Sequence, residues 1–300
     1  MNYVYPKLSE HDLLFVRLGG AGLGNILFAY ARAVVYAQKH HCQLIWPTWA
    51  SIKLGPFLRG ETDKRFYGDL FENRCGAKDG LSKVIKLFTT RHERENAAES
   101  LEGRDNVTVY FEGLDGCFEP VLYDYELIRG HLFGNLKKKN RAALSFDFTN
   151  SIGVHIRLGD FSRVTEEEVR AGRHDSSLPV EWYVRVIRQV LRYAGEDKKV
   201  WIFSDGTDRE LEPVLQIPQA KRITFGTSIA DIAALSRVPL FIASGSSFSM
   251  WARFLGRMSC ICYTNQIKQR LLTSQENSFE YETTGEIEEE IGRRIAEIFR

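Results

Sequence analysis

Three ionisable side chains follow one apolar segment in the second half of the sequence. His155, Arg157 and Asp160 lie in SIGVHIRLGD, residues 151–160, whose first part is apolar and partly β-branched. Charged side chains are seldom buried without a partner, so these three either pair with one another or face a ligand. A guanidinium keeps its charge and binds two phosphate oxygens at once, which makes Arg157 a candidate phosphate ligand. His155 and Asp160 are candidates for proton transfer beside it.

A run of small residues, SGSSFS at 244–249, forms a second candidate site. Ser246 and Ser247 precede a predicted helix, where free backbone N–H groups and the helix dipole favour an anion. The alternative is plain N-capping by a serine hydroxyl. A diphosphate bound between Arg157 and this serine loop would account for both features.

Two further stretches place polar residues beside glycine. WIFSDG, residues 201–206, puts Ser204 and Asp205 at another strand end, although an aspartate there also suits a turn. GGAGLGN, residues 19–25, suggests close approach of the backbone to a ligand. The stretch lacks the third glycine and the later acidic residue of a dinucleotide site, so NAD is not favoured. We expect its Asn25 at the start of a helix, as a ligand or as an N-cap.

These residues need a scaffold, and the order of apolar segments predicts one. Strands and helices alternate through the second half, which indicates a parallel sheet with helices on both faces. Ligands of such sheets collect beyond the carboxyl ends of the strands. We expect strands at 151–156, 199–206, 222–226, 239–244 and, as the last one, 259–264, and helices at 181–194, 209–216, 228–238, 246–256 and 285–300.

The first half is expected to open in the same way. Residues 12–18 read as an apolar strand, followed by the glycine-rich turn and a helix that buries Leu27, Ala31, Val34 and Val35. Further strands are predicted at 42–47 and 107–113. The fold class is therefore α/β, with two domains at 1–148 and 149–300.

Bulk composition excludes several function classes. Forty basic and thirty-nine acidic side chains give a net charge of +1, so no nucleic-acid partner is expected. No apolar stretch is long enough to span a membrane, and no secretory signal opens the chain. The five scattered cysteines lack the paired spacing of a zinc site, and we expect them to be buried, reduced thiols. A cytoplasmic protein is expected.

Together these stretches resemble a known family. GGAGLGNILFAYARA, VHIRLGD, WIFSDG and ADIAALSRVPLFIASGSSFSMWARFLG look like the ordered motifs of the family-11 glycosyltransferases, the α-1,2-fucosyltransferases. The resemblance implies a GT-B architecture of two Rossmann-like domains facing a cleft, with the donor on the C-terminal domain and the acceptor on the N-terminal one. It also implies transfer of L-fucose from GDP-fucose with inversion and without a divalent metal. The expected acceptor is a galactose-type hydroxyl of a glycan, such as a lipid-linked precursor of a surface polysaccharide, which allows peripheral membrane contact.

The resemblance also assigns residues. Arg157 matches the first arginine of the HxRRxD motif, which contacts the β-phosphate, and His155 and Asp160 match its histidine and acidic residue. Donor or acceptor contacts are implied for the other matched positions, namely Gly22, Gly24, Asn25, Ser204, Asp205, Ser246, Ser247 and Phe248.

The chain departs from the family pattern at three positions. Leu158 stands in place of the second arginine, Ile26 in place of a frequent glutamine, and Gly245 in place of the asparagine of SNSS. Two alternatives therefore accompany the fucosyltransferase hypothesis. One is a non-catalytic protein that binds a GDP-sugar or a glycan, and the other is a transferase for a different GDP-sugar.

Overall fold

The chain forms two compact units, residues 1–141 and 142–300 (unit 1 and unit 2). The computed structural model describes residues 1–58, 65–97, 103–159, 161–174, 176–273 and 276–300. The units divide between Arg141 and Ala142. The boundary expected from the sequence, between residues 148 and 149, lies seven residues later.

Unit 2 is built on a six-stranded sheet in which every pair of neighbours is parallel. The order β12-β11-β8-β13-β14-β15 is that of a doubly wound nucleotide-binding sheet, in which the chain reverses its direction of winding between the first strand and the fourth. Here these strands are β8 and β13. The bounds are β8 (Ser151–Ile156), β11 (Lys199–Ser204), β12 (Ala220–Arg222), β13 (Leu240–Ile242), β14 (Ser259–Tyr263) and β15 (Glu280–Thr283).

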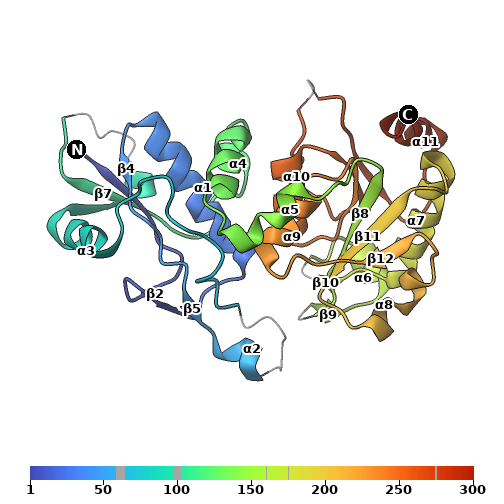
Figure 1. The fold of residues 1–300 in the computed structure, drawn as a ribbon, viewed down its shortest axis with the longest axis horizontal. Coiled ribbons are helices and arrows are strands. Elements are labelled where there is room, and N and C mark those ends of the chain that lie inside the picture. Colours follow the sequence, from blue (N-terminus) through green and yellow to red (C-terminus); the bar gives the residue numbers. More distant parts are fainter. Residues whose placement is uncertain (59–64, 98–102, 160, 175, 274–275) are drawn as a thin grey trace. The chain divides into compact units, whose positions relative to one another are not determined.

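Helices cover both faces of this sheet (Figure 1). On one face α7 (Val180–Ala194) packs against α8 (Asp208–Leu215) and α11 (Glu289–Ile298); on the other α9 (Ser228–Leu235) packs against α10 (Ser247–Gly256) and α5 (Ala142–Ser145). The apolar face expected for the helix at 181–194, from Trp182 to Leu191, is buried. We expected the C-terminal helix to pack back onto its domain, and α11 packs onto α7. Two short strands, β9 (Ser162–Arg163) and β10 (Ser176–Ser177), flank α6 (Glu166–Arg170).

Two strand predictions in unit 2 are wrong. The strand expected at 222–226 ends at Arg222, because the backbone N–H of Phe225 is bound by the Asp231 carboxylate instead of a neighbouring strand. The segment expected at 259–264 does form a strand, β14, but it is not the last one, because β15 follows it at the edge of the sheet. The sequence of β15, EYET, lacks the apolar run by which the other strands were recognised.

Unit 1 contains a second parallel sheet, in the order β4-β1-β7-β6. Its strands are β1 (Tyr3–Pro6), β4 (Gln43–Leu44), β6 (Arg91–Arg94) and β7 (Val107–Phe111), and its helices include α1 (Leu23–Lys39), α3 (Gly80–Thr89) and α4 (Tyr125–Gly134). The four helical residues expected to be buried, Leu27, Ala31, Val34 and Val35, all are.

The strand expected at 12–18 is wrong. Tyr3–Pro6 is the first strand of the sheet, and residues 11–18 form a hairpin of β2 (His11–Asp12) and β3 (Arg17–Leu18). β3 also pairs with β5 (Ser51–Ile52), which leads into α2 (Leu54–Leu58). The apolar residues of the hairpin tip mimic a buried strand, yet Leu13 and Phe15 are exposed.

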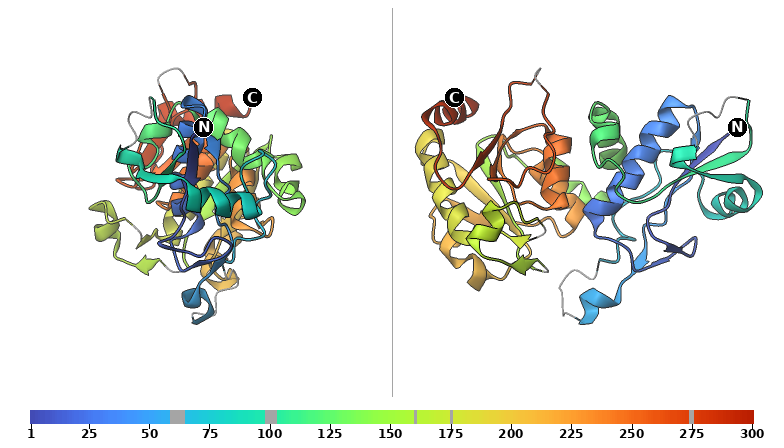
Figure 2. Two further views of the ribbon diagram at one scale, coloured as in Figure 1. Left: turned by 90° about the vertical axis from the view of Figure 1, so that its left-hand side faces the viewer. Right: turned by 180° about the vertical axis from the view of Figure 1, so that it is seen from behind.

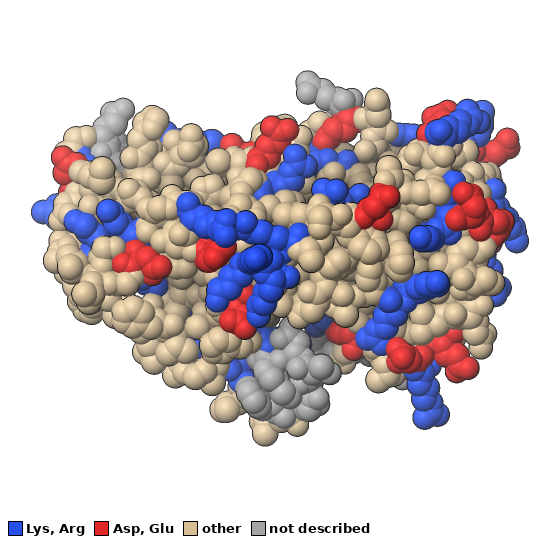
Figure 3. All heavy atoms as spheres, in the orientation of Figure 1, with Lys and Arg blue, Asp and Glu red and all other residues tan. Residues whose placement is uncertain are grey.

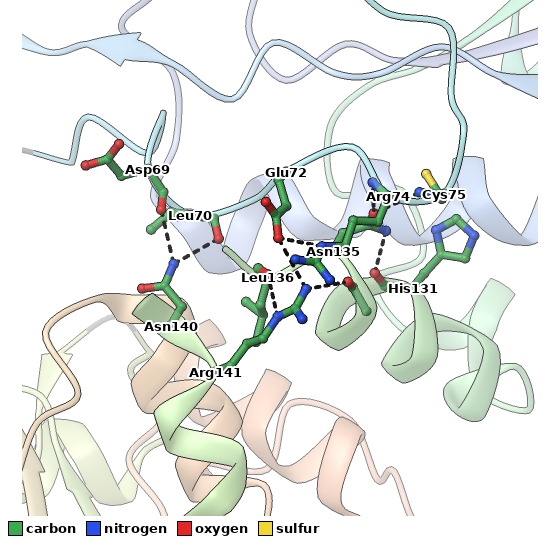
Figure 4. A network of polar contacts seen from close by, with 11 residues as sticks. Asp69, Leu70, Glu72, Arg74, Cys75, His131, Asn135, Leu136, Asn140 and Arg141 are labelled. Atoms are coloured by element: carbon green, nitrogen blue, oxygen red, sulfur yellow. Dashed lines mark hydrogen bonds and ion pairs between the residues drawn. The ribbon is translucent and has the colours of Figure 1, made fainter. Parts of the chain in front are cut away.

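A polar network holds the last residues of unit 1 in place (Figure 4). The Asn140 amide donates to the carbonyls of Asp69 and Leu70, at 3.1 and 2.9 Å. Arg141 donates to the Leu136 carbonyl at 2.9 Å and to the Glu72 carboxylate at 3.2 Å. Charged and amide side chains therefore fix the chain up to the point where unit 2 begins.

Among the described residues, none of the helices has both the length and the apolar character needed to cross a bilayer. All five cysteines are free thiols, and Cys260 and Cys262 are buried as expected. Cys75 is exposed and Cys42 and Cys117 are half-buried, which corrects the expectation of burial for these three residues.

Candidate functional site

The carboxyl edge of the unit 2 sheet gathers most of the residues singled out from the sequence. β8 lies between β11 and β13, so the segments that follow these three strands are neighbours. They carry Arg157 after β8, Ser204 and Asp205 at the end of β11, and the serine loop 244–249 after β13. In a sheet of this order, a nucleotide binds beyond the carboxyl ends of the first and fourth strands, here β8 and β13.

His155 lies at the centre of this edge and organises the serine loop. Its ring is 4% exposed, and Nδ1 lies 2.8 Å from the Ser249 hydroxyl and 3.0 Å from that of Ser244. The ring stacks on Phe248, with centroids 4.4 Å apart. Burial lowers the pKa of His155 to about 3; the nearby Asp205 carboxylate opposes this shift and the Arg157 cation adds to it. The imidazole is therefore neutral at physiological pH and holds the loop in place.

The serine loop presents the start of α10 to this edge. Ser246 is the N-cap, and its hydroxyl accepts a hydrogen bond from the Ser249 N–H at 3.4 Å, so the capping alternative is correct for this residue. The backbone N–H groups of Ser247 and Phe248 come first in the helix, where no intrahelical acceptor exists. The half-buried Ser247 hydroxyl lies beside them. These groups can bind an anion.

Arg157 is held by a neighbouring carboxylate. Its Nη1 lies 2.6 Å from Asp205 Oδ2, and its guanidinium lies over the Phe161 ring at 5.2 Å. Asp205 Oδ1 accepts the Leu158 N–H at 2.9 Å. The Arg157 and Asp205 side chains are 22% and 30% exposed, so a ligand can approach the ion pair from solvent.

A glycine makes this ion pair possible. A Cβ on Gly159 would lie 2.4 Å from Asp205 Oδ2, so any larger residue would displace the carboxylate. The Ser204 hydroxyl turns back to accept the Gly206 N–H at 3.0 Å, which shapes the turn after β11. Asp160, expected to act beside Arg157, lies outside the described residues.

The glycine-rich residues expected to bind substrate lie in unit 1. Gly22 is the N-cap of α1, and Gly24 and Asn25 lie in the first turn of the helix. Asn25 is therefore not the N-cap, and its side chain lines a hollow of about 470 Å³. The hollow opens at the carboxyl ends of β1 and β7, where Lys7 and Glu112 follow these strands.

Charged and polar groups line this hollow together with apolar side chains. Glu112 pairs with Lys7 at 3.1 Å, and Glu95 with the buried Arg32 at 2.8 Å. Burial raises the pKa of Glu95, although the Arg32 guanidinium opposes that shift. Further oxygen and nitrogen groups come from Ser9, Glu10, Asn25, Tyr110 and Asp115. Such a lining suits a ligand with many hydroxyl groups.

Sequence reasoning missed two contacts of the unit 2 site. Asp205 was taken for a ligand residue or a turn former, and its pairing with Arg157 required knowledge that β8 and β11 are neighbours. Ser244 and Ser249 were seen only as part of a small-residue run. Their spacing of five residues across a strand end and a helix start does not reveal a shared partner in His155.

Comparisons with known proteins show the family and the fold. The sequence matches the model of glycosyl transferase family 11 over residues 101–286, more than half of the chain. The fold matches a crystal structure of NodZ α-1,6-fucosyltransferase co-crystallized with GDP, with a TM-score of 0.52 at 18% identity, covering 84% of this chain and 92% of that one. A structure of fucosyltransferase NodZ from Bradyrhizobium matches with a TM-score of 0.52 at 16% identity and the same coverage. The fold is thus α/β of GT-B type. No curated protein matches the sequence.

Proposed function

Because the chain belongs to glycosyltransferase family 11, the galactoside 2-α-L-fucosyltransferase family, we propose that it transfers L-fucose to the 2-hydroxyl of a galactose-type sugar. The family assignment makes it a fucosyltransferase that uses GDP-fucose, while the acceptor and the linkage are the proposed part. One observation carries the proposal: Arg157 and the open start of α10 follow neighbouring strands of a nucleotide-binding sheet.

The reaction explains why a cation and free N–H groups are needed there. The acceptor oxygen attacks the anomeric carbon from the side opposite to GDP, the bond from that carbon to the β-phosphate oxygen breaks, and the configuration inverts. Negative charge grows on the departing diphosphate, where Arg157 and the N–H groups of Ser247 and Phe248 stabilise it. We propose that these groups replace a divalent metal.

The acceptor proton must pass to a base. His155 is a positioning residue in this scheme, because its low pKa and its bonds to the serine loop make it a poor proton acceptor. Asp160, which matches the acidic residue of the HxRRxD motif, is the candidate for this base.

We place the glycan acceptor in the hollow of unit 1. Carboxylates can accept several hydrogen bonds from sugar hydroxyls, and the Asn25 amide can both accept and donate them. We further propose that the enzyme is cytoplasmic and acts on a precursor of a surface polysaccharide.

The direct test measures GDP release from GDP-fucose in the presence of galactosides and determines the product linkage by NMR. The proposal expects turnover and an α-1,2 linkage, and competing GDP-sugars check donor choice. Leu158 favours one alternative, since its side chain packs against the apolar core where the family has a second arginine. Tight GDP binding without turnover on any galactoside would favour that alternative, a non-catalytic sugar-nucleotide-binding protein.

A further inference from the structure

Leu158 follows Arg157 directly, at the position where the family pattern has its second arginine. Its side chain is half-buried and packs against the hydrophobic core of unit 2. It also fills the space beside Gly206, because a Cβ at Gly206 would lie 2.5 Å from Leu158 Cδ1 and 3.3 Å from its Cβ and Cγ. The leucine therefore occupies the volume that any larger residue at position 206 would need.

The backbone of this segment is bound to the same turn. The Leu158 N–H donates to Asp205 Oδ1 at 2.9 Å, while Asp205 Oδ2 lies 2.6 Å from Arg157 Nη1. The Gly206 N–H donates to the Ser204 hydroxyl at 3.0 Å and shapes the turn that carries this carboxylate. One carboxylate thus binds both the guanidinium and the peptide after it.

The contacts between the two segments are reciprocal. β8 and β11 pair in parallel along their whole length and lie side by side, so the residues that follow them leave the sheet together (Figures 1 and 2). In each direction a side chain of one segment faces a glycine of the other: Leu158 faces Gly206, and Asp205 faces Gly159. We name these two contacts the strand-end interlock.

The position of Arg157 matters because it is the one arginine of the VHIRLGD segment. On the face drawn in Figure 3, basic and acidic side chains are mixed over unit 2, so that face has no broad positive field to attract a diphosphate. A single cation stabilises developing charge only when it is held in the correct place before the reaction. The strand-end interlock can provide this.

We propose that Leu158 is a positioning residue for the donor. Its packing on Gly206 fixes the turn after β11, and this turn carries the Asp205 carboxylate that orients Arg157. The inference rests on the proposed function, and it differs from a loss of function at position 158. An arginine introduced there would place a charge among apolar side chains and compete with Arg157 for Asp205, so it would weaken donor binding.

The test measures the Kd for GDP by calorimetry and kcat/KM with GDP-fucose on the same samples. We expect Leu158→Ala and Leu158→Arg each to raise the Kd and lower kcat/KM about tenfold. Leu158→Met restores most of both, because methionine fills a similar volume. Leu215→Ala is the matched control, since Leu215 ends α8 and is a half-buried leucine on the same core. It should leave the Kd unchanged, and melting temperatures verify that each variant folds.

A double-mutant cycle tests the contact itself. Gly206→Ala forces the leucine aside, so it should weaken GDP binding in the wild-type background and have little further effect beside Leu158→Ala. Additive effects in this cycle, an equal loss in the control, or tighter GDP binding or faster turnover in Leu158→Arg would overturn the proposal. A wild type that binds GDP without turnover would contradict the proposed function, while the Kd values would still decide the role of Leu158. A wild type that does not bind GDP would overturn both.

Discussion

At the scale of single residues, the account depends most on Arg157. The sequence predicted this arginine at a strand end, because the apolar segment before it stops at a charged residue. It did not identify the partner: Asp205 is 48 positions away, and only the pairing of β8 with β11 brings it within 2.6 Å. The structure thus adds a carboxylate that orients the guanidinium before a ligand arrives.

We predict that Arg157→Ala lowers turnover roughly a hundredfold, equivalent to about 3 kcal/mol of lost transition-state stabilisation. Arg157→Lys restores only part of the turnover, because a lysine amine cannot bind two phosphate oxygens in the bidentate way of a guanidinium. The partly exposed ion pair with Asp205 contributes less than about 1 kcal/mol to folding, so the melting temperature hardly changes.

Turnover and melting temperature measured on the same samples test this prediction. Arg170→Ala is the control, since it removes another partly exposed ion pair, with Glu166. A sharp thermal loss with near-normal turnover in the folded fraction would make Arg157 a structural residue only.

The neutral state of His155 leads to a prediction about pH. The folded protein keeps this imidazole unprotonated down to about pH 3, whereas an unfolded histidine gains its proton near pH 6.5. The contribution of the neutral ring to stability is therefore complete above pH 6.5 and is lost as the pH falls below it. We expect His155→Gln to destabilise the protein more at pH 8 than at pH 5. Thermal unfolding at both values checks this, and an unchanged difference would refute a buried neutral His155.

At the scale of elements, long apolar segments were predictable and short polar ones were not. β8, β11, β13 and β14 were found because each is an apolar run before a polar turn. β15 was missed because its residues are polar, and the 11–18 hairpin was misread because Leu13 and Phe15 are apolar but exposed. The serine loop contacts His155 of β8 only because β8 and β13 are neighbours in the sheet, and no local sequence pattern predicts this contact.

The junction of β13 and α10 depends on Ser249. Its fully buried hydroxyl contacts His155, the Ser244 N–H and the Ser244 hydroxyl, at 2.8, 3.2 and 3.0 Å. Ser249→Ala should cost about 1–3 kcal/mol of stability and raise the KM for GDP-fucose, because the phosphate-binding start of α10 loosens.

Ser236→Ala provides the matched control for Ser249→Ala. It removes another buried hydroxyl of unit 2, that of the C-cap residue of α9, which donates to the Ala233 carbonyl of the same helix at 2.8 Å. We expect it to leave the KM for GDP-fucose unchanged. Equal effects of the two substitutions on KM would contradict a role of the serine loop in donor binding.

At the scale of the whole molecule, the sequence motifs predicted the GT-B fold and the family, while the acceptor side was hardly predictable. The unit 1 hollow is lined by residues from the loop after β1, from α1, β6 and β7 and from the segments that follow β6 and β7, separated by up to about a hundred positions. Its polar residues are ordinary in their local sequence context. Only Asn25 was singled out beforehand, through the glycine-rich motif.

The charge arrangement in unit 2 predicts metal-independent turnover. In the proposed reaction, Arg157 and the start of α10 supply the positive charge that a divalent cation would otherwise provide to the departing diphosphate. GDP release should therefore continue unchanged in EDTA. Loss of activity in the chelator and its recovery with manganese or magnesium would show that the role assigned to Arg157 is wrong.

The most direct measurement of the central claim is a crystal structure of the full chain with GDP. The account predicts the β-phosphate within hydrogen-bonding distance of the Arg157 guanidinium and of the Ser247 and Phe248 N–H groups, beyond the carboxyl ends of β8 and β13. A diphosphate bound elsewhere, with Arg157 contacting only protein groups, would contradict it.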